Sequence, residues 1–530
     1  MEKKFCLATI SLVGLFVLMF FRVNLKLEVF ELLVLIISIY TLIIFPFKHY
    51  LKAFHDPLSR EGFVGFGLAI GAIYSIVNLI MIGAVNNIIQ ISLIALIYYL
   101  YNRFIADKSS DLVYDEIRTH NLSDLEKNCI TSLDIIRWVL ILYFLISAFI
   151  INNIYRGEYN LIISLLLLIL FSSNLKIFRY AMSLPFLRCK NNLEKLDTTY
   201  ANNLLIEKVF QSKDIFIDVR GVAIEDRYEF ENIHASNPKY ALQIAASLMR
   251  SDDHPLSKAV LFEAESKDVT KHFISHTNNF QGKGIIGRIN NENFAIGNME
   301  LMKEVDIAVG VLIREKIKLE NQGKTVLVLA KTLANKKSYD KNPGEVIGLF
   351  IFNSEVIPQF DQISQNLSNE NINLTYLSGE EGSTLMARLE NVKHEELLAN
   401  LSSEEKIKYI EQTVQKNIDK YYIQISKKLV VDNSNLVNIL IDNHKISGLN
   451  IISINQYDPK KLLNIYRSMT DSYKKARTNY HFSWLYHIFI MFFSISAVKL
   501  SSSGYIYIVA FLLSLLSEQL VIINSNSKQY

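Results

Sequence analysis

SKDIFIDVRGVAIED, residues 212–226, holds a short apolar run that ends in a carboxylate and is followed by a glycine. The run IFI at 215–217 predicts the end of a buried strand, and Asp218 follows it directly. Gly221 then favours a tight turn. Open α/β sheets place their chemistry at the carboxyl ends of parallel strands. Asp218 is therefore the first candidate catalytic residue, and we interpret the rest of the chain outward from it.

Apolar residues are unevenly distributed along the 530 residues of the chain. Half of all residues are hydrophobic, and the apolar runs are dense before residue 180 and after residue 480. A membrane-spanning helix needs about 20 apolar residues, so these runs predict eight spans. The predicted spans cover residues 5–22, 29–47, 63–84, 86–102, 134–153, 160–178, 482–499 and 504–523.

Charged residues between the spans predict their orientation. Lysines and arginines flank the second and third spans and recur in segment 103–133, whereas loop 154–159 holds only Arg156. By the positive-inside rule, both termini and the large region 187–478 lie in the cytoplasm. The first apolar run has no small-residue cleavage site, so we interpret it as a retained span. We thus expect a multi-pass protein of a bacterial inner or plasma membrane, in contact with lipid.

Net charge and cysteine content exclude two further classes. The formal net charge is +3 and no domain-wide basic excess is visible, which argues against nucleic acid as a partner. The three cysteines, at positions 6, 129 and 189, have no pairable spacing. They predict neither a disulfide framework nor a cysteine metal cluster.

From residue 200 to residue 480, apolar strands alternate with amphipathic helices, which is typical of an α/β fold. The predicted strands cover residues 214–218, 325–330, 346–352, 373–377, 421–425 and 428–432. The predicted helices cover residues 239–250, 256–267, 299–321, 360–369, 381–391, 403–416 and 458–476.

Four side chains near the ends of these elements form a consistent set for phosphoryl transfer. Asp218 is the nucleophile, which would give an aspartyl-phosphate. Ser378 and Lys406 hold the transferred phosphoryl oxygens, and Asp432 helps to hold Mg²⁺, a hard ion that prefers oxygen ligands. Each residue alone also fits a plainer role, because an aspartate after a strand is often a turn residue or a helix cap. Only their order and spacing favour the catalytic interpretation.

Several further motifs occur in one order along the chain. They are SDDHPLSKAV at 251–260, FQGKGIIGRINNENFAIGNMELM at 280–302, GKTVLVLA at 323–330, GEVIGLFIFNSEV at 344–356, LTYLSGEEGSTLMARLENV at 374–392 and YHFSWLYH at 480–487. In this order the chain resembles a heavy-metal-transporting P-type ATPase of the copper-pump kind. The strongest match is the first motif, which is similar to that family's Ser-Glu-His-Pro-Leu-Ala-Lys-Ala.

The resemblance implies a helical membrane domain and a cytoplasmic haloacid-dehalogenase-like phosphorylation domain with an inserted α+β nucleotide-binding domain. The expected order is 1–103, spans one to four; 104–133, a short cytoplasmic connector; 134–186, spans five and six; 187–232, the first part of the phosphorylation-like domain; 233–343, the nucleotide-binding-like domain; 344–478, the second part of the phosphorylation-like domain; and 479–530, spans seven and eight. ATP and Mg²⁺ are the cofactors that the resemblance implies.

The resemblance also places a nucleotide pocket at His254, Gly282 and Gly284. A histidine and a glycine-rich backbone can face a flat adenine ring without steric hindrance. The alternative for His254 is a helix start, because Pro255 fits the first turn of a helix.

The phosphorylation signature departs from the family pattern. The family has Asp-Lys-Thr-Gly-Thr where residues 218–222 read Asp-Val-Arg-Gly-Val, so the lysine and both threonines are missing. The two valines supply no hydrogen bonds to a phosphate. The family's actuator domain is also missing, since segment 103–133 is too short for a domain and contains no Thr-Gly-Glu triplet. A phosphoenzyme would therefore lack its route to hydrolysis.

The expected metal path has lost its soft ligands. Residues 176–178, Lys-Ile-Phe, align with the family's Cys-Pro-Cys, so the thiolates that select Cu(I) are absent. The polar side chains left on the expected ion path are Tyr486, His487, Ser517 and Glu518. Ionisable groups within a membrane span are functional candidates by default.

Three functions remain open at this point. The departures favour a pseudoenzyme that keeps the architecture, binds ATP and regulates or assembles another membrane protein. The alternatives are an active ATP-dependent, copper-like cation transporter and a membrane-anchored haloacid-dehalogenase-type phosphatase. The phosphatase needs an acid–base residue two positions after its nucleophile, where this chain has Arg220. The sequence identifies neither a transported metal nor a partner.

Overall fold

The computed structural model describes two compact units, which are treated separately below. One comprises residues 1–191 with 471–530, and the other comprises residues 192–470. The described residues are 36, 60–82, 86–104, 122–280, 282–308, 310, 312–332, 344–389, 391–428, 430–441, 448–503 and 505–527. The first two predicted spans, 5–22 and 29–47, lie outside these residues apart from position 36.

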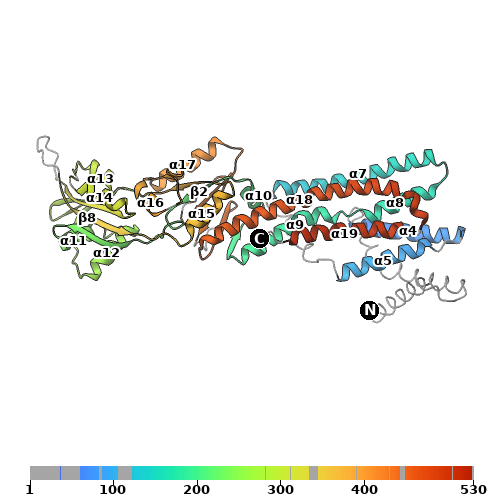
Figure 1. The fold of residues 1–530 in the computed structure, drawn as a ribbon, viewed down its shortest axis with the longest axis horizontal. Coiled ribbons are helices and arrows are strands. Elements are labelled where there is room, and N and C mark those ends of the chain that lie inside the picture. The colour runs from blue at the N-terminus through green and yellow to red at the C-terminus, as the bar shows by residue number, and fades with distance from the viewer. Residues whose placement is uncertain are drawn as a thin grey trace. The chain divides into compact units, whose positions relative to one another are not determined.

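The first unit is helical (Figure 1). Its described helices are α4 (Arg60–Ile82), α5 (Asn86–Phe104), α7 (Asp124–Ile154), α8 (Tyr159–Ser172), α9 (Lys176–Glu194), the second half of α18 (Pro459–Ala497), η2 (Val498–Ser503) and α19 (Ile506–Asn526). Among the described residues, five stretches are long and apolar enough to cross a membrane: Gly62–Met81, Asp124–Ile154, Tyr159–Glu194, Pro459–Leu500 and Ile506–Asn526. The span predicted at 86–102 corresponds to a shorter apolar helix, Ile88–Asn102.

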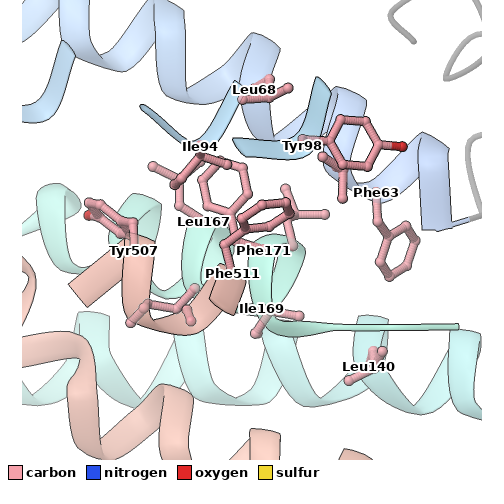
Figure 2. Close-up of a cluster of buried hydrophobic side chains, with 14 of the residues drawn as sticks. Phe63, Leu68, Ile94, Tyr98, Leu140, Leu167, Ile169, Phe171, Tyr507 and Phe511 are labelled. Carbon is pink, nitrogen blue, oxygen red and sulfur yellow. The ribbon is translucent and has the colours of Figure 1, made fainter. Parts of the chain in front are cut away.

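Large side chains interlock at the centre of this unit, as Figure 2 shows. Phe511 of α19 meets Phe171 of α8 and Tyr98 of α5 in edge-to-face contacts, with ring centroids 6.5 and 6.0 Å apart. A Cβ atom at Gly67 of α4 would lie 2.9 Å from the Phe171 ring, so α4 approaches α8 closely. Helices in a membrane associate through such packing, because lipid tails are as apolar as the side chains.

The span predicted at 160–178 is interrupted in the structure. Helix α8 ends at Ser172, Ser173 is extended and α9 begins at Lys176. The hydroxyls of Ser172 and Ser173 donate to the carbonyl oxygens of Leu168 and Ile169, both at 2.6 Å. These hydroxyls add second hydrogen bonds at the end of α8, where the Ser173 N–H already donates to the Ile169 carbonyl oxygen at 3.0 Å. The Ser172 carbonyl oxygen, which a continuing helix would have used, accepts from the Tyr486 hydroxyl.

The second unit contains two sheets. The first is a seven-stranded, mainly parallel sheet in the order β1-β13-β12-β11-β2-β9-β10, in which β1 alone is antiparallel to its neighbour. Its strands are β1 (Thr198–Tyr200), β2 (Asp214–Asp218), β9 (Asn373–Leu377), β10 (Leu397–Leu398), β11 (Tyr422–Ser426), β12 (Leu436–Ile441) and β13 (Ile451–Ile454). Its helices are α10 (Leu204–Gln211), α15 (Phe360–Asn369), α16 (Gly382–Arg388), η1 (His394–Glu396), α17 (Ser403–Lys416) and the first part of α18. We call this the parallel-sheet domain.

The second sheet is antiparallel and is inserted between β2 and β9. Its order is β3-β8-β7-β6-β5-β4. The strands are β3 (Glu229–Ala235), β4 (Ile274–Phe280), β5 (Gly284–Ile289), β6 (Glu292–Gly297), β7 (Thr325–Thr332) and β8 (Glu345–Asn353). The helices are α11 (Pro238–Leu248), α12 (Pro255–Ser266), α13 (Met299–Glu304) and α14 (Leu312–Glu320). We call this the antiparallel-sheet domain.

Two predicted elements of this unit are wrong. The helix expected at 299–321 is two helices, α13 and α14. The strand expected at 428–432 is a loop, and the next strand is β12. The backbone of Val431 is held by the side-chain amide of Asn438. The Val431 N–H donates to Asn438 Oδ1 at 3.2 Å, and the Val431 carbonyl oxygen accepts from Asn438 Nδ2 at 2.9 Å. A side-chain amide thus replaces the strand partner that the apolar run suggested.

Candidate functional site

Asp218 ends β2 at the carboxyl edge of the parallel sheet, as the sequence predicts. Strand β2 lies between β11 and β9, with Ile217 opposite Ile425 and Asp218 opposite Leu377. Gly221 has φ +83°, and its N–H donates to the carbonyl oxygen of Ile224 at 2.7 Å. The predicted tight turn is therefore present, and Gly221 suits it because positive φ is costly for other residues.

Lys406 meets Asp218 directly. Its Nζ lies 2.8 Å from Asp218 Oδ1, and the two side chains are only 10% and 16% exposed. Lys406 lies in the first turn of α17, which Ser402 caps by accepting a hydrogen bond from Glu405 N. Burial raises the pKa of Asp218 above its ordinary value, and the charge and hydrogen bond of Lys406 oppose that rise. The structure brings these two predicted residues together as a shielded ion pair.

Ser378 lies in the loop after β9, beside the end of β2. Its hydroxyl accepts a hydrogen bond from Glu380 N at 3.1 Å, and its N–H donates to the carbonyl oxygen of Leu398 at 2.9 Å. The hydroxyl therefore closes a local turn. Its position next to the Asp218 strand agrees with the predicted set, while its described contacts are structural.

Asp432 is not brought to Asp218 by any contact among the described residues. It lies exposed in the loop that follows β11. The residue that follows the end of β11, beside Asp218, is Lys427, whose side chain approaches Gly221: a Cβ atom at that glycine would lie 3.1 Å from Lys427 Cδ. Lys427 and Lys428 lie 3.8 and 3.7 Å from Asp226. A cation thus stands where the predicted second metal carboxylate was expected.

Cations oppose the carboxylates where Mg²⁺ was expected. Magnesium binds in proteins through carboxylates and other oxygen ligands in near-octahedral geometry. Here Asp218 is paired with Lys406, and the next strand end carries Lys427. Within the part of the chain that the structure describes, no group of three or more His, Cys, Asp or Glu side chains is arranged to hold a metal ion.

Arg220, two residues after Asp218, is held away from solvent by several groups. Its Nη1 donates to the carbonyl oxygen of Glu225 at 2.6 Å and to Ser354 Oγ at 2.9 Å. Its guanidinium stacks on the Tyr228 ring with 3.9 Å to the ring centroid, and it forms an ion pair with Glu380. Sequence reasoning noted that Arg220 departs from the family but did not identify these partners, of which Ser354 and Glu380 are distant in the chain.

The three residues predicted to line a nucleotide pocket also have structural roles. His254 is the N-cap of α12, where Nδ1 accepts from Leu256 N at 3.2 Å and Pro255 takes the first helical position. Although the side chain is exposed, local desolvation and the Arg220 and Lys428 cations lower the pKa of His254, against the raising effect of Asp252 and Asp226. The helix-start alternative therefore holds for His254, and its ring also lies within electrostatic reach of the residues around Asp218.

Gly282 and Gly284 both have positive φ, at +75° and +144°. We expect Gly284→Ala to lower the free energy of unfolding by about 1–3 kcal/mol, because its Cβ would lie 2.2 Å from the carbonyl oxygen of Ile296 in the paired strand. Gly282→Ala is the matched control, since its Cβ would meet Ser402 only at 3.6 Å. Thermal unfolding of the two purified variants without nucleotide measures the difference. Equal loss in both would contradict this packing role for Gly284.

Polar residues on the expected ion path form one contact group in the helical unit. Asn174, in the break between α8 and α9, lies with Nδ2 at 2.7 Å from the carbonyl oxygen of Ser514, 3.4 Å from Ser517 Oγ and 3.5 Å from Glu518 Oε2. Sequence reasoning missed Asn174, although the polar run Ser172-Ser173-Asn174 inside an apolar span was a usable signal.

The two aromatic candidates on this path hold other groups. Tyr486 donates from its hydroxyl to the carbonyl oxygen of Ser172 at 2.5 Å, and the rings of Tyr486 and His487 meet edge to face with 5.4 Å between centroids. His487 Nδ1 lies 2.8 Å from the carbonyl oxygen of Ser483, and its ring stacks on Phe178 at 5.4 Å. The structure thus joins Ser517 and Glu518 through Asn174, and it places Tyr486 at the α8 break.

No family model matches the chain. A probable copper-importing P-type ATPase A from Enterococcus hirae is 22% identical over 213 residues, which are 39% of this chain and 27% of the relative. A copper-exporting P-type ATPase from Staphylococcus haemolyticus is 24% identical over 207 residues, 39% of this chain and 24% of the relative. The matched stretch thus spans about a quarter of the length of these relatives.

The crystal structure of a zinc-transporting PIB-type ATPase in the E2.Pi state matches with a TM-score of 0.50 and 13% identity, covering 98% of both chains. At this identity the likeness concerns the fold. Membrane-spanning helices and a large cytoplasmic region make the chain a multi-pass membrane protein. The chain is therefore related to the heavy-metal P-type ATPases and has their fold, with membrane helices and a cytoplasmic α/β domain into which an α+β domain is inserted.

Proposed function

We propose that this protein is a membrane pseudoenzyme with the fold of a heavy-metal P-type ATPase. It keeps the cytoplasmic architecture, retains ATP binding and acts on another membrane protein in a regulatory or assembly role. The observation that carries the proposal is the strand end beside Asp218, where the cation Lys427 stands in place of the expected second metal carboxylate.

Phosphoryl transfer depends on positioning and on neutralising the charge of the phosphoryl oxygens, largely through metal ions. A carboxylate nucleophile also needs Mg²⁺ beside it, and the strand end next to Asp218 carries Lys427 where a carboxylate was expected. Lysine supplies positive charge but no ligand for Mg²⁺. The arrangement therefore supports a protein that keeps the aspartate at the end of β2 but has a lysine where a ligand for Mg²⁺ was expected.

The connection between two membrane helices supports the same conclusion. Helix α5 ends at Phe104 and α7 begins at Asp124, so residues 105–123 are all that separate them. A domain takes about 50 residues or more. In this chain, water-directed hydrolysis of a phosphoenzyme would have no domain between α5 and α7 to carry it out.

We expect the purified full chain to form no acid-stable phosphoenzyme when it is incubated with γ-labelled ATP and Mg²⁺. The reason is that cations oppose both carboxylates of this site: Asp218 pairs with Lys406, and Asp226 lies 3.8 and 3.7 Å from Lys427 and Lys428. Acid-quenched gel autoradiography measures the label, and Asp218→Asn is the matched control because it keeps the size of the side chain. Label in the native protein that disappears in this variant would overturn the pseudoenzyme proposal.

Nucleotide binding is tested separately on the same preparation. ATP that binds only the folded chain raises its melting temperature, by an amount that grows with concentration above the dissociation constant. We expect such a rise with ATP, both with and without Mg²⁺. If ATP causes no shift, the ATP-binding part of the proposal fails while the pseudoenzyme part stands.

One observation favours the second candidate, an active cation transporter. The carbonyl oxygen of Ser514, Ser517 Oγ and Glu518 Oε2 gather around Asn174, and such oxygens suit a hard cation better than a soft metal. Cation-dependent phosphorylation of Asp218 in the labelling experiment would identify this function. The phosphatase alternative gains no support, since Arg220 at its acid–base position is bound to four other groups.

A further inference from the structure

Arg220 belongs to a buried charge network that crosses from one cytoplasmic domain to the other. Arg220 and Glu380 come from loops that follow β2 and β9 of the parallel-sheet domain. Their ion pair is covered by Tyr228, which packs into the core of the antiparallel-sheet domain. The Tyr228 hydroxyl donates to Glu380 Oε1 at 2.8 Å, while its ring stacks on the Arg220 guanidinium. One aromatic side chain thus contacts both charges.

Arg388 makes a second set of contacts between the two domains. It ends α16 and is only 6% exposed, with Nη1 at 3.0 Å from Glu380 Oε2. Its Nε donates to the carbonyl oxygen of Gly323 at 2.5 Å, and its Nη2 donates to Thr325 Oγ1 at 3.1 Å. Gly323 and Thr325 belong to the turn and first residue of β7, in the antiparallel-sheet domain. Both arginines therefore share one carboxylate at the junction of the domains.

We propose that Arg220, Glu380 and Arg388 form a latch that keeps the antiparallel-sheet domain seated against the carboxyl edge of the parallel sheet. The latch is a built-in conformational constraint, and it holds independently of whether ATP binds. Glu380 is its centre, because each of its oxygens accepts from or pairs with groups on both domains. Planar guanidinium groups suit such a role, since they present several donors in fixed geometry.

The consequence concerns domain motion. The three charged side chains belong to the parallel-sheet domain, and the contacts that cross to the antiparallel-sheet domain are those with Tyr228, Gly323 and Thr325. Separation of the two domains would break these contacts together and leave the charged groups without them. The latch therefore disfavours opening of the junction, which lies two residues from Asp218 and keeps that carboxylate in its shielded setting.

Hydrogen exchange on the full chain in detergent tests the latch. We expect amides of residues 226–231, 321–326 and 379–389 to exchange on the order of tenfold faster in Glu380→Gln than in the native protein, because the junction opens more often. Amides in the centres of β11–β12 and β5–β6 should stay protected over the same exchange times, since they exchange only when a sheet unfolds. The measurement is peptide-level mass spectrometry at a fixed pH.

Two variants keep the test decisive. Arg220→Thr removes one cation and should also accelerate hydrogen exchange at the junction. The double variant with Arg220→Thr and Glu380→Gln should exchange little faster there than Glu380→Gln alone, because both substitutions act on one network. Native-like exchange at the junction in both single variants would overturn the latch. Equal acceleration across both sheets would also overturn it, because it would report general destabilisation instead of opening at the junction.

Discussion

Lys406→Met is expected to lower the free energy of unfolding of the cytoplasmic unit by about 3–5 kcal/mol at neutral pH. The reason is local: Lys406 Nζ lies 2.8 Å from Asp218 Oδ1, and neither side chain is more than 16% exposed. Removal of the lysine leaves a buried carboxylate without its cation. For a unit of this size, the melting temperature should fall by on the order of ten degrees, as measured on the full chain in detergent.

The loss should depend on pH in a defined direction. Burial already raises the pKa of Asp218 and Lys406 opposes this, so removing Lys406 raises the pKa further. A carboxyl whose pKa is higher in the folded state than in the unfolded state favours folding more as pH falls. The defect of Lys406→Met should therefore be largest above the raised pKa of Asp218 and should shrink as the pH is lowered and the carboxyl is protonated.

The matched control is Lys406→Met combined with Asp218→Asn. This double variant has no charge left at the pair, so it should recover much of the loss at neutral pH and show a weaker pH dependence. If the single variant is as stable as the native protein at pH 7, the pair is not a buried contact in solution. A loss that grows towards acid pH would likewise contradict the assignment.

The position of Asp218 was predictable because it depends on local pattern. An apolar run, a carboxylate and a glycine predicted β2, Asp218 and the turn at Gly221, and all three occur. Lys406 was also predictable, since the capping sequence Ser402 to Glu405 places it in the first turn of α17. These features need only neighbours along the chain and the rule that parallel strands present their carboxyl ends together.

The second half of the site depended on register, and there the sequence misled. The apolar run before Asp432 looked like a strand, whereas β11 ends at Ser426 and the loop is held by Asn438. A displacement of a few residues moved a lysine, Lys427, to the position expected for a carboxylate. Two partners of Arg220 could not be predicted from the sequence either, because Ser354 and Glu380 lie more than a hundred residues away in the chain.

Glu380→Gln is the other substitution for which a large effect is expected, again about 3–5 kcal/mol of unfolding free energy. Glutamine keeps the shape of the side chain but removes the charge shared by Arg220 and Arg388, which are 19% and 6% exposed. Burial and the proximity of Arg388 already lower the pKa of Arg220. Two guanidinium groups would then face each other across a neutral amide, so the folded state loses attraction and gains repulsion.

The pH response separates this defect from that of Lys406→Met. Guanidinium groups do not lose their protons in the pH range where proteins are stable. The repulsion between Arg220 and Arg388 in Glu380→Gln is therefore not relieved by a change of pH. Its loss should be nearly constant from about pH 5 to pH 8, whereas that of Lys406→Met should shrink towards acid. Arg220→Thr is the control, with a smaller loss of unfolding free energy expected because Glu380 keeps Arg388 at 3.0 Å.

Thermal unfolding of Lys406→Met, Glu380→Gln and Arg220→Thr across this pH range measures both effects. A smaller loss in Glu380→Gln than in Arg220→Thr would mean that the carboxylate is not the centre of the network.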